Sequence, residues 1–149
     1  MIRTFALLLC AFAAASAADF IGTWKLNTAK SKYDGMPMPK EQTVTYTAKG
    51  DGYDYVAKGT SATGEPIQAM FSYVKDGQEA KATGFPHWDG LVLTGGSGKK
   101  SKAKLMRGGK AVGSATRTVS ADGKSMTVAG KATTADGKKV TYSAVYDKQ

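Results

Sequence analysis

Residues 20–27 read Phe-Ile-Gly-Thr-Trp-Lys-Leu-Asn, and they lie directly behind an apolar N-terminal segment. Gly22 and Trp24 form a G-x-W strand start, and the indole of Trp24 brings a large apolar area that favours burial. We therefore expect the folded part of the chain to begin with a β-strand over residues 21–27.

The segment before this strand has the features of a secretory leader. Arg3 precedes an apolar run over residues 5–15, and small residues follow the run. The run is shorter than the roughly 20 residues that span a bilayer. We expect residues 1–18 to be a signal peptide that is cleaved after Ala17 or Ala18. The mature chain would then be exported to the periplasm or the cell exterior.

Removal of the leader changes the chemistry of the chain. A lipid anchor on Cys10 is disfavoured because Leu9 precedes it, so Cys10 leaves with the leader. The mature chain then has no cysteine for a disulfide, a thiolate nucleophile or a metal site. Loss of Arg3 lowers the formal net charge from +9 to +8, and such a surface attracts anions non-specifically. Residues 19–149 have the length of one domain, and none of their segments has the length and apolarity of a transmembrane helix.

Glycine-containing turns recur at intervals of roughly 8–14 residues, and several hold Asp-Gly, which adopts positive φ at low cost. The segments between them predict ten strands, near residues 21–27, 42–49, 53–60, 66–75, 79–84, 90–94, 100–107, 111–119, 125–133 and 139–147. Successive hairpins make neighbouring strands antiparallel, and so large a sheet tends to close. We expect an all-β, antiparallel up-and-down meander barrel of about 8–10 strands.

Alternation along the strands predicts which side chains share a face. The shared faces are Ile67, Ala69, Phe71 and Tyr73 in residues 66–75; Ala111, Gly113, Ala115, Arg117 and Val119 in residues 111–119; and Val140, Tyr142, Ala144 and Tyr146 in residues 139–147. The small side chains of residues 111–115 leave room inside a barrel. A barrel of this size is either packed by large residues such as Phe71 and Trp24 or open to one ligand, and both alternatives remain.

Residues 20–26 resemble the first strand of the calycin superfamily, in which lipocalins begin with G-x-W and fatty-acid-binding proteins often begin with F-x-G-x-W-x-L. The chain also resembles small exported bacterial proteins of uncharacterised function, which begin G-T-W-K-L-N-x-x-K-S-K-Y and end near V-Y-D-K-Q. The resemblance implies a lipocalin-like barrel that holds a small hydrophobic or amphipathic ligand. It also implies that Gly22 and Trp24 close the barrel by packing and do not touch the ligand.

Two departures from the fatty-acid-binding pattern concern the ligand site. That family closes its barrel with two short helices, whereas residues 28–41 contain two prolines and are predicted to be a loop. Its last strand grips a carboxylate with Arg and Tyr, whereas here Tyr146 is kept and Ala144 stands at the arginine position. Arg117 is a candidate replacement, since an inward guanidinium pairs well with an acid; alternatively, its side chain reaches out to solvent. The predicted ligand-binding residues are Phe71, Tyr73, Arg117, Tyr142 and Tyr146.

Residues 84–90 read Gly-Phe-Pro-His-Trp-Asp-Gly and are predicted to form a loop. The aromatic side chains beside His87, including Trp88, suggest a portal or contact patch, and packing of a long loop explains them equally well. Some calycin-like barrels bind haem through one histidine, which makes His87 a candidate ligand, although a lone loop histidine is more often solvated. We expect no cofactor and no metal site.

The sequence offers no catalytic constellation. His87 is the only histidine, and the mature chain has no cysteine, so Ser-His, Cys-His and zinc arrangements lack their parts. Most acidic residues, such as Asp76 and Asp122, lie in predicted turns, where Asp serves backbone geometry. We therefore expect a protein that is not an enzyme and has no catalytic residues.

Lys100, Lys102 and Lys104 fall on one face of a predicted strand and form a positive row. Such a row suits an anionic surface at the cell envelope or, more simply, keeps an outer strand soluble. No aromatic-basic signature of an RNA-binding sheet is present, so we expect a monomer without a specific nucleic-acid partner. The sequence predicts ligand binding inside the barrel. The alternative is a packed, non-catalytic module that acts at the envelope through its basic outer surface.

Overall fold

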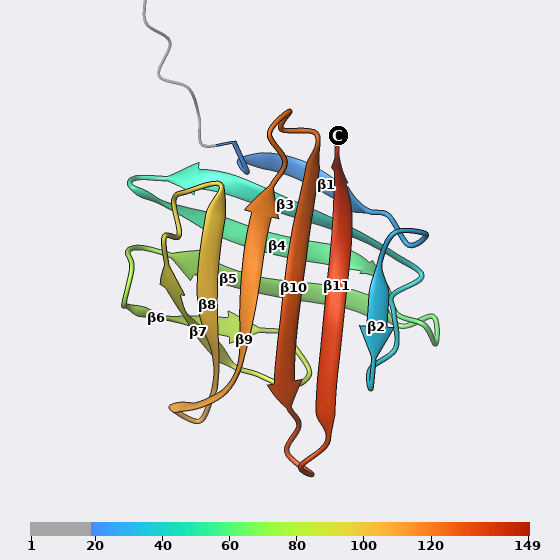
Figure 1. Ribbon diagram of the computed structural model, residues 1–149. Coiled ribbons are helices and arrows are strands. Elements are labelled where there is room, and N and C mark those ends of the chain that lie inside the picture. The colour runs from blue at the N-terminus through green and yellow to red at the C-terminus, as the bar shows by residue number, and fades with distance from the viewer. Residues whose placement is uncertain (1–18) are drawn as a thin grey trace, which may run out of the picture.

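The computed structural model describes residues 19–149, and in this range it consists of strands, turns and loops without a helix (Figure 1). The predicted signal peptide lies outside the described residues. Residues 19–149 contain eleven strands: β1 (Gly22–Leu26), β2 (Lys32–Asp34), β3 (Glu41–Lys49), β4 (Gly52–Thr60), β5 (Pro66–Tyr73), β6 (Glu79–Thr83), β7 (Gly90–Thr94), β8 (Lys100–Arg107), β9 (Lys110–Val119), β10 (Ser125–Thr133) and β11 (Lys139–Lys148).

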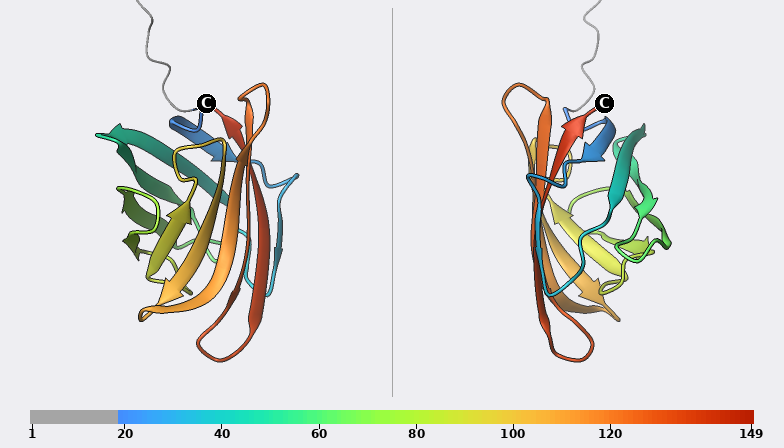
Figure 2. Two further views of the ribbon diagram at one scale, coloured as in Figure 1. Left: turned by 60° about the vertical axis from the view of Figure 1, so that its left-hand side comes forward. Right: turned by 90° about the vertical axis from the view of Figure 1, so that its right-hand side faces the viewer.

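The sheet closes on itself, because β1 pairs antiparallel with β3 on one side and with β11 on the other. From β3 to β11 each strand pairs with the next one along the chain. β1 lies against one end of β11 and β2 against the other, so these two short strands share a single position in the ring. The predicted antiparallel meander barrel is confirmed. Figure 2 shows β8–β11 as one curved wall facing the wall formed by β3–β7.

The prediction that residues 28–41 form only a loop is wrong in part. Lys32–Asp34 form β2, and Tyr33 pairs with Tyr142 of β11. The hydroxyl of Ser31, just before β2, donates to the carbonyl oxygen of Asn27 (2.7 Å) and accepts from the backbone nitrogen of Val145 (2.9 Å). These bonds pin the connection between β1 and β2 to β11. The two helices of the fatty-acid-binding pattern are replaced by this short strand and a proline-containing loop.

The predicted alternation of inner and outer faces is confirmed on β5 and β11. Ala69 and Tyr73 are buried, whereas Met70, on the opposite face of β5, is 40% exposed. On β11 the side chains of Val140, Ala144 and Tyr146 are all buried, with Tyr142 half-buried between them. The core therefore lies inside the ring of strands.

The Asp-Gly turns have the role expected of them. Gly123 and Gly137 adopt positive φ values of 70° and 85° in the turns before β10 and β11. Beside Gly123, the carboxylate of Asp122 accepts hydrogen bonds from the Ser120 hydroxyl and the Lys124 backbone nitrogen. These bonds, with that from Ser120 the largest cause, lower the pKa of Asp122. Such carboxylates stabilise hairpin turns at the ends of the barrel.

Trp24 lies at the end of the barrel where the chain enters. Its side chain is fully buried, and its indole nitrogen donates to the carbonyl oxygen of Phe20 (2.9 Å). The Nζ atom of Lys148 lies 4.9 Å from the centre of a Trp24 ring and donates to the carbonyl oxygen of Ile21 (2.9 Å). We call this end of the barrel, with Phe20 and Trp24 at its centre, the floor.

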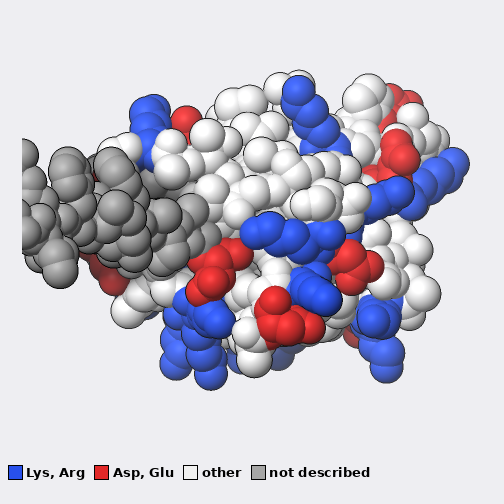
Figure 3. All heavy atoms as spheres, turned by 90° about the horizontal axis from the view of Figure 1, so that it is seen from above, with Lys and Arg blue, Asp and Glu red and all other residues white. Residues whose placement is uncertain are grey.

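Seen from outside, the floor end shows basic and acidic side chains interspersed (Figure 3). Lys99 and Asp19, for example, form an ion pair there at 3.7 Å. Within residues 19–149, no helix is long and apolar enough to cross a membrane.

Candidate ligand cavity

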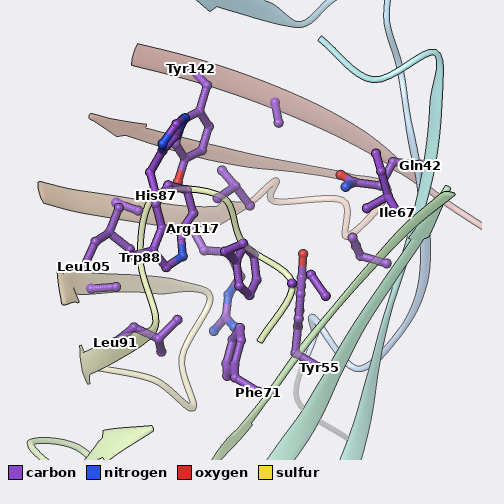
Figure 4. Close-up of a pocket in the computed structure, with 18 of the residues that line it drawn as sticks. Gln42, Tyr55, Ile67, Phe71, His87, Trp88, Leu91, Leu105, Arg117 and Tyr142 are labelled. Atoms are coloured by element: carbon purple, nitrogen blue, oxygen red, sulfur yellow. The ribbon is translucent and has the colours of Figure 1, made fainter. Parts of the chain in front are cut away.

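A cavity of about 500 Å³ lies inside the barrel, between the two walls (Figure 4). This volume falls in the range of small-molecule sites, which is about 300–1,000 Å³. The alternative that the barrel is completely packed is therefore wrong. Beyond the strands, the cavity is lined by residues of three loops: 36, 37 and 39 in the first, 61 and 62 in the second, and 84–88 in the third. These loops connect strands at the end away from the floor. We call that end the mouth.

Aromatic side chains make up much of the cavity wall. Those that line it are Tyr33, Tyr46, Tyr53, Tyr55, Phe71, Phe85, Trp88, Tyr142 and Tyr146. Burial raises the pKa of Tyr46 to about 12 and raises the pKa values of Tyr55 and Tyr146 well above their ordinary value. These hydroxyls therefore stay protonated at neutral pH and offer neutral donors. One is already engaged, since Tyr146 donates to Oε1 of Gln42 (2.7 Å).

Among the described residues that line the cavity, Arg117 is the only Lys, Arg, Asp or Glu. The expectation that its side chain reaches out to solvent is wrong. It is only 5% exposed. Its Nη1 donates to the Tyr53 hydroxyl (3.2 Å), and its Nη2 donates to the carbonyl oxygens of Gly96 (2.9 Å) and Gly98 (3.0 Å). Its Nε is buried and has no hydrogen-bond partner within residues 19–149. No carboxylate of the described chain lies within ion-pair distance of the guanidinium.

The loop between β7 and β8, residues 95–99, provides the carbonyl groups that bind Arg117, and Asp76 holds this loop in place. The carboxylate of Asp76 accepts from the backbone nitrogens of Gly95 (2.8 Å) and Gly96 (2.9 Å) and from the hydroxyl of Tyr73 (2.8 Å). These bonds, with that from Gly96 the largest cause, lower the pKa of Asp76. The carboxylate thus holds in place the loop whose carbonyl groups bind the guanidinium.

Four of the five predicted ligand-binding residues line the cavity: Phe71, Arg117, Tyr142 and Tyr146. Tyr73 does not. Its side chain points inward, as predicted, but its ring stacks on Tyr53 at 4.9 Å and its hydroxyl is taken by Asp76. Tyr73 lies at the floor end of β5, below the open space. Gly22 and Trp24, predicted to close the barrel, also lie outside the cavity lining.

Sequence reasoning did not single out several residues of the wall. Tyr53 and Tyr55 are two such residues on β4. Tyr53 and Tyr55 are two positions apart, so alternation along β4 places them on one face, and both line the cavity. Tyr33 could not be assigned to the cavity wall by alternation, since it stands in a segment predicted to be a loop.

The loop of residues 84–90 closes part of the mouth. Trp88 is buried and lies between Phe85 and Tyr142, with ring centres 5.3 and 6.2 Å away. His87 also lines the cavity, and its carbonyl oxygen accepts from Nη1 of Arg107 (2.9 Å). Packing of the loop therefore accounts for Trp88, and the rings of the loop also border the mouth. No group of three potential metal ligands occurs in the described part of the chain.

Comparison of the sequence with family models and with curated proteins finds no match. Among solved structures, the ileal bile acid-binding protein of zebrafish, complexed with cholic acid, is similar with a TM-score of 0.51 and 12% identity, over 88% of this chain and 99% of that one. The siderocalin Ex-FABP has a TM-score of 0.39 and 10% identity, over 88% of this chain and 74% of that one. The redesigned barrel mFAP0, bound to DFHBI, has a TM-score of 0.47 and 14% identity, over 87% and 99%. At these identities the first likeness shows a shared barrel fold.

Proposed function

We propose that this protein is an exported, non-catalytic binding protein that holds one small hydrophobic or amphipathic molecule inside its barrel. The observation that carries the proposal is the pairing of a mainly apolar cavity of about 500 Å³ with the buried guanidinium of Arg117 on its wall. An apolar body gains free energy by leaving water, and a single polar group fixes its orientation.

The charges of the cavity favour a neutral or acidic ligand. None of the described residues that line it is Asp, Glu or Lys, so Arg117 sets the sign of the local potential. A buried cation without a carboxylate is costly, and an acidic group on the ligand would offset that cost through charge-assisted hydrogen bonds. A cationic ligand would be repelled by the guanidinium, and no carboxylate of the described lining would compensate for this repulsion. We therefore place the acidic end of the ligand toward Arg117 and its apolar body toward the mouth.

The comparison with solved structures is compatible with this ligand class. The zebrafish bile acid-binding protein shares the barrel fold, and its structure is a complex with cholic acid, an amphipathic acid. The features of residues 1–18 support export to the periplasm or the cell exterior, and we propose that the chain acts there as a monomer.

One observation favours a second candidate function, binding to an anionic surface at the cell envelope. Lys100, Lys102 and Lys104 are all exposed on the outer face of β8. Their cross-strand neighbours on β9 are Thr118, Thr116 and Ser114, and none of the three lysines forms an ion pair within residues 19–149. This surface does not depend on the cavity, so the two functions are separable.

The experiment that tests the cavity is mass spectrometry of the purified protein after incubation with an extract of lipids and metabolites from its source cells. Native and denatured samples are compared at low and high salt. We expect one small molecule per chain, released on denaturation and retained at high salt. Salt ions only weakly screen the interactions of a ligand that is buried inside a barrel. A protein that stays empty in repeated extracts would contradict the cavity function and leave the lysine row as the functional surface.

A further inference from the structure

The aromatic residues of the wall form a continuous stack across the mouth. Tyr33 stacks on Tyr142 with an interplanar angle of 25°, and Tyr142 on Trp88 with 18°. Trp88 stacks on Phe85 with 25°, and Phe85 on Tyr55 with 26°. Ring centres along this path are 5.3 to 6.2 Å apart. The rings are therefore close to parallel from one side of the barrel to the other.

The middle of the stack is provided by a loop and its two ends by strands. Tyr142 belongs to β11, and Tyr55 belongs to β4, where it also stacks on Phe71 of β5 at 4.7 Å and 15°. Phe85 and Trp88 come from the connection between β6 and β7. The loop thus inserts two flat rings between the two walls of the barrel, and Figure 4 shows Trp88 and Tyr142 on one side of the cavity and Tyr55 on the other.

The two inserted rings are held unequally. Next to Trp88, the carbonyl oxygen of His87 accepts from Arg107, and the backbone nitrogen of Asp89 donates to the carbonyl oxygen of Met106 (2.9 Å). Phe85 makes no hydrogen bond to the described part of the chain and is only half-buried, so its ring contacts alone hold it in place. Gly84 precedes it with a φ of 81°, a conformation that glycine adopts without strain. Of the two inserted rings, Trp88 is buried and Phe85 is the more exposed and the less firmly held.

We propose that the cavity takes a planar, ring-containing acid, such as a conjugated polycycle with a carboxylate, whose ring enters the stack between Trp88 and Tyr55 in place of Phe85. This proposal rests on the proposed function and specifies its ligand class. Near-parallel aromatic faces match a flat ring, and each such pair contributes about 0.5–1.5 kcal/mol beyond burial. A rigid ring also loses less conformational freedom on binding than a flexible acyl chain.

Two acids distinguish this ligand class on the unmodified protein: 1-pyrenebutyric acid, which is planar, and palmitic acid, which is a saturated chain. We expect calorimetric titration to show about tenfold tighter binding of the planar acid, because its ring restores the two stacking pairs that Phe85 gives up, whereas a saturated chain in the same place does not. We also expect an induced circular dichroism signal in its absorption bands, because the stack holds the chromophore in a chiral site. Equal or tighter binding of palmitic acid would overturn the planar class and leave the proposed function standing. Binding of neither acid at any concentration below its solubility limit would overturn both.

Substitutions test the position of the ring. Trp88→Leu should weaken the planar acid about tenfold and change palmitic acid less than about twofold. Phe85→Ala should strengthen the planar acid severalfold, because the free protein no longer has a stacked ring to displace. Weaker binding in Phe85→Ala would show that Phe85 is part of the wall and would overturn the exchange. Met70→Leu, on the outer face of β5, is the matched control and should change neither affinity.

Discussion

The guanidinium carbon of Arg117 lies 3.7 Å from the centre of the Phe20 ring. Phe20 is 2% exposed and does not line the cavity, so it covers the guanidinium from the side of the floor. Phe20 also packs edge-on against Tyr46 and Tyr53, at 5.4 and 5.0 Å. Phe20 therefore shields the guanidinium of Arg117 from solvent on the side of the floor.

Phe20→Leu should lower the free energy of unfolding by about 2 kcal/mol, because leucine keeps most of the apolar burial but loses the cation–π contact and the aromatic edges. Urea unfolding measures this loss. A double-mutant cycle with Arg117→Met isolates the contact and should give a coupling of about 1–2 kcal/mol. A coupling near zero would show that the two side chains are neighbours without an energetic link.

Arg117→Met should weaken binding of an amphipathic acid by at least about tenfold, since a hydrogen bond to a charged group contributes about 1.5–3 kcal/mol. The methyl ester of the same acid should bind with nearly unchanged affinity. Fluorescence titration of the acid and its ester on both proteins measures the difference. Arg117→Lys is the control for charge, and it should retain part of the preference for the acid. If acid and ester weaken equally in Arg117→Met, the arginine serves packing alone.

Asp76→Asn should destabilise the protein and weaken the hydrogen bonds between the loop of residues 95–99 and the guanidinium of Arg117. The pKa of Asp76 lies below its ordinary value of 3.8, because three donors stabilise the carboxylate. Its contribution to stability is therefore present above that value and is lost as the pH falls through the lowered pKa. Urea midpoints of wild type and Asp76→Asn should differ at pH 7 and converge toward pH 3. The control is Asp51→Asn, in the exposed turn before β4, which should match wild type at both pH values.

The buried tyrosines predict a steep loss of stability in alkali. Burial raises the pKa values of Tyr33 and Tyr46 from 10.0 to about 12. Between these values the unfolded chain releases the protons while the folded chain keeps them, so rising pH favours unfolding. Each such tyrosine adds up to about 1.4 kcal/mol per pH unit to the loss. Urea unfolding at pH 9 and pH 11 measures it, and an unchanged midpoint would show that these hydroxyls are accessible to water.

Replacement of Lys100, Lys102 and Lys104 by Gln should abolish binding to vesicles that contain anionic phospholipid and leave ligand uptake in the cavity unchanged. The three side chains point away from the barrel, whereas their neighbours on β8, Ser101 and Leu105, are buried. Vesicle sedimentation at rising salt measures the effect, because interactions between exposed charges are screened. Failure of the wild type to bind such vesicles at low salt would remove the second candidate function.

Much of the fold follows from local signals in the sequence, whereas the shape of the cavity does not. Glycine turns and alternation predict where the strands lie and that Phe71, Arg117 and Tyr142 face inward, because both signals act within one hairpin. β2 is missed because three residues are too few to show alternation. Tyr73 and Phe71 carry the same signal, yet only Phe71 borders open space. The difference depends on depth along the barrel axis, which is set by the pairing of all the strands together.

The pairing of β1 with β11 also determines when this molecule can fold. Trp24 lies opposite Lys148 in that pairing, and Nδ2 of Asn27 donates to Oδ2 of Asp147 (3.0 Å) across 120 positions of sequence. A nascent chain that has not yet released β11 leaves the edges of β1 and β10 unpaired, and such edges invite association with other chains. Contacts this distant in sequence also make folding slow. β11, the last strand of this ring along the chain, thus completes the barrel, and a closed interior exists only once it has paired with β1.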